Sequence, residues 1–162
     1  WLLIGMIGGI GNSMILGNFD STFAAHPEMA LYIPLIGGTG GNVGTQSSAL
    51  VVQGLANSSL DAKNTFKQVS KEAVVALINA TIISLLVYTY NFIRFGATAT
   101  VTYSVSISLF SVVMFASIFG TLVPMTLEKM KIDPAIATGP FIAITNDIIG
   151  MMMYMGITVL LS

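Results

Sequence analysis

A lone carboxylate, Asp147, lies in the hydrophobic stretch "GPFIAITNDIIGMMMYMGITVLLS" at residues 139–162. It stands fourteen residues after Asp133 and fifteen before Ser162, so in a continuous helix it lies about 21 Å from either residue, near the bilayer midplane. An aspartate at that depth costs roughly 2.5 to 3.5 kcal/mol and usually faces a bundle interior or an aqueous cavity. Because the predicted spans hold no Lys, Arg or His to pair with it, we expect Asp147 to bind a cation or a proton. A protonated side chain bonded to a neighbouring helix stays open as the structural alternative.

The second candidate is the segment "GGTGGNVGTQSS" at residues 37–48, which places five glycines inside a hydrophobic stretch. One interpretation is close helix packing through two GxxxG pairs. The pairs are Gly37 with Gly41 and Gly40 with Gly44. The other is a locally unwound helix whose carbonyls at residues 39–42 face a water-filled path. Both stay open, whereas a nucleotide-binding loop is excluded because the required glycine spacing and following lysine are absent.

Oxygen ligands accompany these glycines. Asn42 and the "TQSS" run at residues 45–48 supply amide and hydroxyl groups and no soft ligands. Mg²⁺ takes oxygen ligands and gives up its waters reluctantly. A site with a small number of carboxylates, together with water, carbonyls and amides, therefore suits it. Hydrogen bonding between helices is the alternative role for Asn42 and Gln46. Pro34 and Pro140 lie near the two polar segments, and interrupted spans of this kind point to a transport site.

The composition indicates a membrane protein. Charged residues make up 8% of the chain, hydrophobic residues 54%, and the mean hydropathy is +0.86, against about 25% charged residues in soluble domains. A net charge of -1 offers no surface for nucleic acid. The chain has no cysteine and one histidine, His26, which excludes disulfides, thiolate sites and multi-histidine metal sites.

Charge-free stretches of about 20 residues predict an all-α membrane protein with five transmembrane helices. The predicted spans cover about residues 1–17, 29–56, 73–92, 98–124 and 134–161, in a single pore domain over residues 1–162. The first stretch lacks the charged start and cleavage site of a signal peptide. We expect a transmembrane helix cut close to its start, in an excised piece of a longer protein.

The lysines predict the orientation. The loops after the second and fourth spans hold all the lysines, whereas the alternate loops hold only Arg94. The lysines are Lys63, Lys67, Lys71, Lys129 and Lys131. By the positive-inside rule these two loops are cytoplasmic, which places the N-terminus inside and the C-terminus outside. Asp133, at the start of the fifth span, is either an acid that complements the helix dipole or part of a pore mouth.

In these segments the sequence resembles the transmembrane domain of the MgtE family of magnesium channels, which is related to eukaryotic magnesium solute carriers. The resemblance is carried by "PLIGGTGGNVGTQSSALVVQGLA" at residues 34–56 and "DPAIATGPFIAITNDIIG" at residues 133–150, supported by "GNFD" at residues 17–20. It covers essentially the whole chain in the number and order of spans. The run GGNVGTQ is a far more specific signal than a bare glycine run.

The resemblance implies a homodimer in the bilayer, with spans two and five lining a central pore through which Mg²⁺, the transported ion, passes largely hydrated. The family's central pore aspartate falls on Asp147, so the dimer would present two such carboxylates. Asp133 matches an acid near the cytoplasmic mouth. The other pore-lining residues that we predict are Gly40, Gly41, Asn42, Gln46, Ala143 and Asn146. We expect the protein in a bacterial inner membrane.

Two departures from the family pattern stand out. Bacterial members usually carry a cytoplasmic N-terminal helical domain and paired CBS domains that sense Mg²⁺, and the 162 residues hold neither. Position 139 is Gly where some members are expected to place a polar residue.

We expect divalent cation permeation, with a hydrated Mg²⁺ held by paired Asp147 side chains. A Na⁺- or H⁺-coupled carrier and a non-conducting membrane scaffold are the alternatives. An intramembrane aspartyl protease needs two aspartates on separate spans, and the predicted spans hold one, so we expect no enzyme. The sequence does not distinguish a channel from a carrier, and it does not show which of Mg²⁺, Mn²⁺, Co²⁺ and Ca²⁺ is selected.

Overall fold

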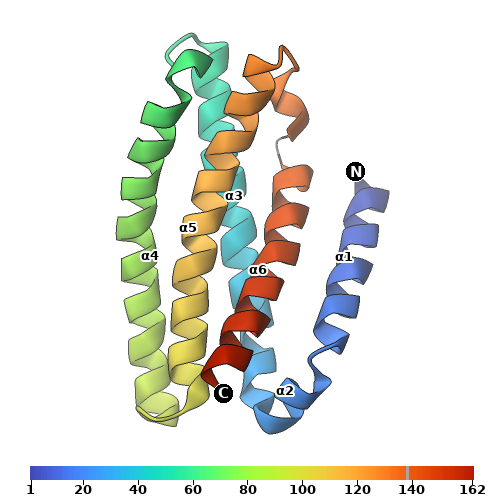
Figure 1. Cartoon of the computed structure of the whole chain (residues 1–162), viewed down its shortest axis with the longest axis vertical. Coiled ribbons are helices and arrows are strands. Elements are labelled where there is room, and N and C mark those ends of the chain that lie inside the picture. Colours follow the sequence, from blue (N-terminus) through green and yellow to red (C-terminus); the bar gives the residue numbers. More distant parts are fainter. Residues whose placement is uncertain (138) are drawn as a thin grey trace.

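The computed structural model describes residues 1–137 and 139–162, and the regular elements in them are helical. The long helices are α1 (Leu2–Gly17), α3 (Ile33–Ala56), α4 (Thr65–Phe95), α5 (Thr100–Lys129) and α6 (Pro140–Leu161). The connections hold α2 (Asp20–Ala25) and the 3₁₀ turns η1 (Pro27–Tyr32), η2 (Ala62–Asn64) and η3 (Pro134–Ala137). The long helices run alternately in opposite directions along the bundle (Figure 1). The all-α class is confirmed.

Three segments of the described chain are long and apolar enough to cross a membrane: Ala62–Phe95, Thr100–Lys129 and Pro140–Leu161. They correspond to the third, fourth and fifth predicted spans. The helix α1 is apolar but has 16 residues. The helix α3 has 24 residues, but glycines and polar side chains lower its hydropathy. Five crossings and a dimer therefore stay predictions.

Two helices extend beyond their predicted ends. The helix α4 begins at Thr65, ahead of the predicted start at residue 73, because the Lys, Gln and Glu residues of its first turns are good helix formers despite their polarity. The helix α5 continues through Pro124 to Lys129. A proline removes one backbone hydrogen bond, and membrane helices tolerate this loss because their neighbours hold the segment in place.

The fifth predicted span, 134–161, is wrong in its first residues. Its helix, α6, begins at Pro140, after the turn η3 and after Gly139, whose φ is +60°. A proline in the first turn favours a helix start, since its missing N–H has no partner there. Asp147 is therefore the eighth residue of a 22-residue helix. It lies about 10 Å from the start of α6 and about 21 Å from its end, so the expected central position within one continuous helix is also wrong.

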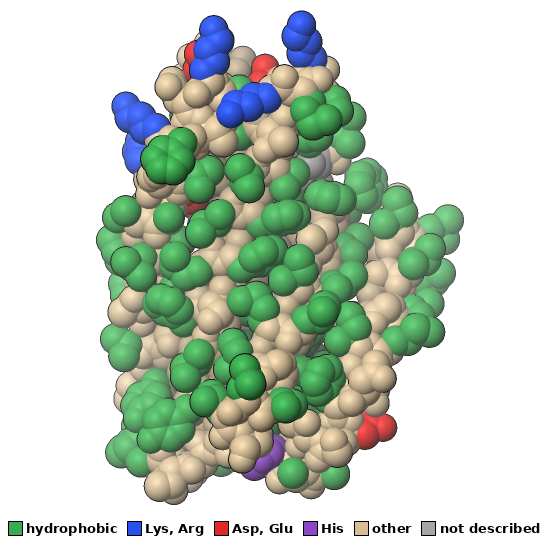
Figure 2. Space-filling view, viewed as in Figure 1, with side chains coloured by type: hydrophobic (Ala, Val, Ile, Leu, Met, Phe, Trp, Pro, Cys, Tyr) green, Lys and Arg blue, Asp and Glu red, His purple; other side chains and the backbone are tan. Residues whose placement is uncertain are grey.

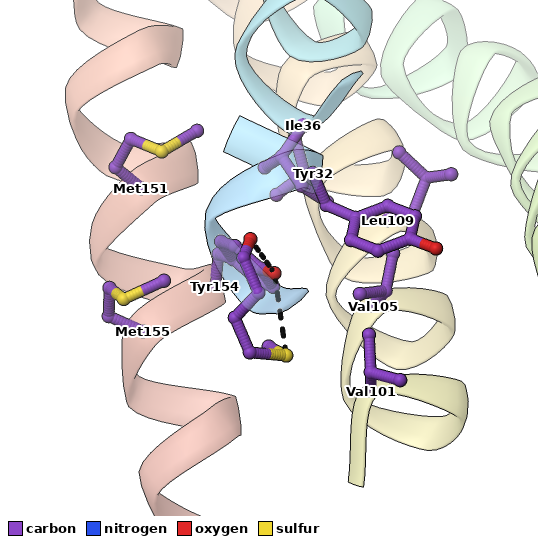
Figure 3. Close-up of a cluster of buried hydrophobic side chains, with 10 residues drawn as sticks. Tyr32, Ile36, Val101, Val105, Leu109, Met151, Tyr154 and Met155 are labelled. Carbon is purple, nitrogen blue, oxygen red and sulfur yellow. Dashed lines mark hydrogen bonds between the residues drawn. The ribbon is translucent and has the colours of Figure 1, made fainter. Parts of the chain in front are cut away.

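The helix α5 occupies the centre of the bundle and packs against α3, α4 and α6, while α1 lies at the edge against α6 (Figure 1). A buried cluster fills the end of the bundle where α5 begins (Figure 3). Its members are Met29, Tyr32, Ile36, Val101, Val105, Leu109, Val112, Met151, Tyr154 and Met155. The hydroxyl of Tyr154 donates a hydrogen bond of 2.8 Å to the carbonyl of Met29, which ties α6 to η1.

The charged side chains mark the two ends of the bundle. Lysine side chains in this view gather at the end that holds the α3–α4 and α5–α6 connections, and apolar side chains cover the flank below them (Figure 2). We call this the lysine end; Lys67 and Lys129 belong to it. Arg94 lies at the opposite end, where it donates a hydrogen bond of 2.6 Å to the Tyr90 hydroxyl. The apolar flank between charged ends fits a membrane protein, and which end is cytoplasmic stays a prediction.

Candidate functional site

The carboxylate of Asp147 on α6 lies against a glycine face of α3. A methyl group built at Gly41 would lie 3.3 Å from Oδ1 of Asp147, and one built at Gly37 would lie 3.7 Å from it. The two missing side chains thus let the half-buried carboxylate approach the α3 backbone. Among the described residues the ion-pair contact found is His26 with Glu28, and none involves Asp147.

A groove of about 320 Å³ runs between α3 and α6 beside this carboxylate. It is lined by Asn12 of α1, by Ile33, Pro34, Gly37, Gly38, Gly41, Asn42 and Thr45 of α3, and by Ala143, Asp147 and Met151 of α6. Its side is open, since Gly38 and Asn42 are exposed. The groove has room for several waters, each of which takes about 30 Å³ in the liquid.

The glycine segment is regular helix, which contradicts the second of the two open interpretations, local unwinding at residues 39–42. The Thr45 hydroxyl donates to the carbonyls of Gly41 at 2.8 Å and of Asn42 at 3.1 Å. These carbonyls thus already accept a hydroxyl, in the manner common for threonine inside a helix. What the glycines provide is space beside the helix rather than free carbonyls.

The second glycine pair of α3 serves packing. A side chain at Gly40 would lie 2.8 Å from Val112 of α5, and one at Gly44 would overlap the amide of Asn146. On α5, a side chain at Gly120 would overlap the backbone of Gly44. Close approach of helices through small residues is the usual role of GxxxG pairs in membranes, and here it brings α3, α5 and α6 into direct contact.

The predicted site residues separate into three places. Gly41, Asn42, Ala143 and Asp147 come together in the groove. Gly40 and Asn146 lie between helices, with Asn146 1% exposed and both of its amide atoms without a hydrogen-bond partner in the described chain. Gln46 is exposed on α3. The pore-lining role of each stays a prediction.

Asp133 lies at the lysine end, away from the groove. Its Oδ1 accepts a hydrogen bond of 2.9 Å from the backbone N–H of Ala135 at the start of η3. This is the capping role that an acid has at the beginning of a helical turn, and it leaves the proposed pore-mouth role as a prediction.

Sequence reasoning missed two polar groups. Asn12, which lines the groove from α1, is one of the few polar residues of an apolar helix, and that was its available signal. Glu72 was assigned to a polar loop, but it lies in α4 and its Oε1 accepts hydrogen bonds from Ser47 of α3 at 2.8 Å and Ser117 of α5 at 2.5 Å. No sequence signal pointed to this three-helix contact, which we call the Glu72 cluster.

The donor set of the groove fits a hydrated hard cation. In residues 1–137 and 139–162 no three His, Cys, Asp or Glu side chains come close enough to hold a metal together. The groove offers one carboxylate with amide and hydroxyl groups. A cation that keeps most of its waters, as Mg²⁺ does, needs few direct protein ligands.

Comparisons with known proteins bear on the same segments. The model of the MgtE family, described as a divalent cation transporter, matches residues 33–157, from the start of α3 into α6. Proteins named magnesium transporter MgtE are similar over nearly the whole chain. The Bacillus subtilis protein is 31% identical over 157 residues, which are 97% of this chain and 35% of the relative. The Thermus thermophilus protein is 32% identical over 161 residues, 99% of this chain and 35% of the relative.

The chain thus spans about a third of the length of these relatives. Their names describe transporters and not enzymes, and the family model covers α3 and α6, which border the groove. The resemblance noted in the sequence is confirmed: this chain belongs to the MgtE family of divalent cation transporters.

Proposed function

We propose that this chain forms the ion-conducting part of a Mg²⁺ transport pathway, in which the hydrated ion moves along the groove between α3 and α6 past Asp147. The observation that carries the proposal is the carboxylate itself. It belongs to a helix apolar enough to cross a membrane, borders a groove with amide and hydroxyl groups, and has no basic partner in the described chain. The relatives named magnesium transporters support the same ion.

The physical basis is charge attraction with retained water. An ionised carboxylate in a poorly polarisable environment attracts a divalent cation far more strongly than it does in bulk water. Water on Mg²⁺ directs its hydrogens outward, so Asp147 and the amide oxygen of Asn42 are suitable acceptors for the hydration shell. Selectivity then follows from the size and charge of the hydrated ion.

The open side of the groove supports a paired arrangement. A second copy related by a two-fold axis would cover that side and bring two Asp147 carboxylates to one pathway. Gln46, exposed in the single chain, is then available to the pathway or to the partner. We place the lysine end in the cytoplasm of a bacterial inner membrane, with Asp133 at the inner mouth.

The test is Mg²⁺ uptake into liposomes that contain the protein and an internal Mg²⁺-sensitive dye. Asp147→Asn keeps the shape of the side chain and removes its charge. We expect uptake to fall on the order of 100-fold, because bonds to an ionised group contribute up to about 3 kcal/mol. Asp20→Asn, which removes an exposed carboxylate at the start of α2, is the matched control and keeps normal uptake. Wild-type uptake by a folded Asp147→Asn protein would overturn the proposal.

The same liposomes separate a channel from a coupled carrier. Uptake that persists with equal Na⁺ and pH on both sides indicates a channel driven by the Mg²⁺ gradient. Uptake that stops when those gradients are removed indicates a Na⁺- or H⁺-coupled carrier. An absence of uptake under every gradient would indicate a non-conducting membrane scaffold.

A further inference from the structure

Packing does not account for the polar side chain of Asn12. It lies in the middle of α1, a helix of otherwise mostly apolar residues and glycines. Its Oδ1 is buried and accepts no hydrogen bond from the described residues. A buried amide oxygen without a donor is destabilising, so such groups are normally satisfied by protein or by water.

Asn12 borders both of the spaces that flank Asp147. On one side is the groove between α3 and α6. On the other is a smaller cavity of about 80 Å³ between α1 and α6, lined by Gly5, Gly8, Gly9, Asn12, Ile144 and Asp147. Asn12 and Asp147 are the two residues that line both spaces, and in the smaller one they supply the polar side chains.

The packing of α1 on α6 fixes this position. Gly8 lies against Ile144, since a side chain at Gly8 would come 2.5 Å from Cγ2 of that residue. Asn12 follows Gly8 by four residues and Asp147 follows Ile144 by three, so each lies on the contacting face of its helix. The glycine contact thereby holds Asn12 at the level of the carboxylate.

We propose that Asn12 is a positioning residue of the ion site, with its amide oxygen accepting a hydrogen bond from a water in the hydration shell of the cation at Asp147. The inference rests on the proposed function of the groove and adds α1 as a third wall of the site. Hydrating water presents hydrogens outward, so an acceptor on the α1 side complements the carboxylate on α6. The unpartnered oxygen of Asn12 is such an acceptor.

The first measurement is the Mg²⁺ concentration that gives half-maximal uptake in liposomes. Asn12→Ala removes the acceptor, and we expect this concentration to rise about fivefold, the effect of one lost hydrogen bond. Asn18→Ala, at the C-terminal cap of α1, is the matched control. Its exposed amide bonds to the Met14 carbonyl, away from the site, and it keeps the wild-type value.

The second measurement separates a site role from a structural one. Asn12→Asp adds a carboxylate to the site without changing its shape. Ca²⁺ binds directly to several carboxylate oxygens and loses water more readily than Mg²⁺. We expect Ca²⁺ to inhibit Mg²⁺ uptake by Asn12→Asp at about tenfold lower concentration than in the wild type, a shift that loss of packing would not produce.

The outcomes distinguish the two proposals. Wild-type half-saturation in Asn12→Ala and wild-type Ca²⁺ inhibition in Asn12→Asp would overturn the role of Asn12, while loss of uptake in Asp147→Asn would still support the groove. Normal uptake in Asp147→Asn would overturn both. Gel filtration in detergent establishes whether each variant is folded. If Asn12→Ala aggregates, the Ca²⁺ inhibition of Asn12→Asp still tests the inference.

Discussion

The two GxxxG pairs of α3 lie on different faces of one helix and do different things. Gly37 and Gly41 leave space for the carboxylate of Asp147 and border the open groove. Gly40 and Gly44 are buried against α5 and α6 with no space left over. The same spacing therefore creates a polar groove on one face and close packing on the other. Both faces meet α6, and the packed face also meets α5.

Each face also has its own carboxylate. On the groove side Asp147 has no ion-pair partner in the described chain. On the packed side, the Glu72 carboxylate accepts hydrogen bonds from Ser47 and Ser117, whose hydroxyls are 3.2 Å apart. A carboxylate satisfied by protein donors stabilises structure, whereas one without protein donors is available to a solute. The comparison predicts that changes on the packed face alter stability and changes on the groove face alter uptake.

The largest expected effect is on the packed face. Gly120→Ala places a methyl group into the backbone of Gly44, which cannot move without separating α5 from α3. We expect a loss of about 3 kcal/mol in stability, at the upper end of overpacking effects. Thermal unfolding in detergent measures it, with Gly38→Ala as the control because nothing lies within 4 Å of a methyl group there. Equal unfolding temperatures for the two variants would contradict the packed arrangement.

The Glu72 cluster is expected to show the next largest effect. Glu72→Gln keeps an acceptor oxygen but removes the charge that strengthens the two hydroxyl bonds, and we expect stability to fall by about 1 to 2 kcal/mol. Uptake per folded molecule should stay within about twofold of the wild type, since nothing in the groove changes. A strong fall in uptake with unchanged unfolding would place Glu72 in the ion pathway and contradict its assignment to the packed face.

The smallest effect is expected on the groove face. Gly41→Ala places a methyl group 3.3 Å from Oδ1 of Asp147, a contact that a small shift of the carboxylate relieves. We expect uptake to fall about threefold, less than the effect of one lost hydrogen bond, with no loss of stability. Unfolding and uptake measured on the same preparation test this. Destabilisation without a change in uptake would assign Gly41 to packing instead.

Much of this arrangement follows from local sequence signals. Hydrophobic stretches predicted the helices. The polar segments, together with the family resemblance, predicted one pore lined by Asp147 and the α3 glycines; in the structure the carboxylate lies beside Gly37 and Gly41, and the pore stays a prediction. These signals are local because neither the length of an apolar stretch, about 20 residues, nor the cost of a lone charge within it depends on which helices pack nearby.

What the sequence did not predict depends on contacts between distant segments. The rotation of α3 about its axis decides that Gly41 lines the groove and Gly40 does not, and it depends on where α5 and α6 lie. Glu72 appeared to belong to a loop because its hydroxyl partners are far away in the chain. Asn12 lies near Asp147 because α1 packs beside α6.

The close contact at Gly44 bears on which part of the site is able to move. Gly44 lies against Gly120 of α5 on one side and Asn146 of α6 on the other, so α3, α5 and α6 form one closely packed block. The helix α1 rests against that block through Gly8 and Ile144. The helix α1 makes fewer contacts with this block than α3, α5 and α6 make with one another, so its displacement would unpack the least of the structure around the site.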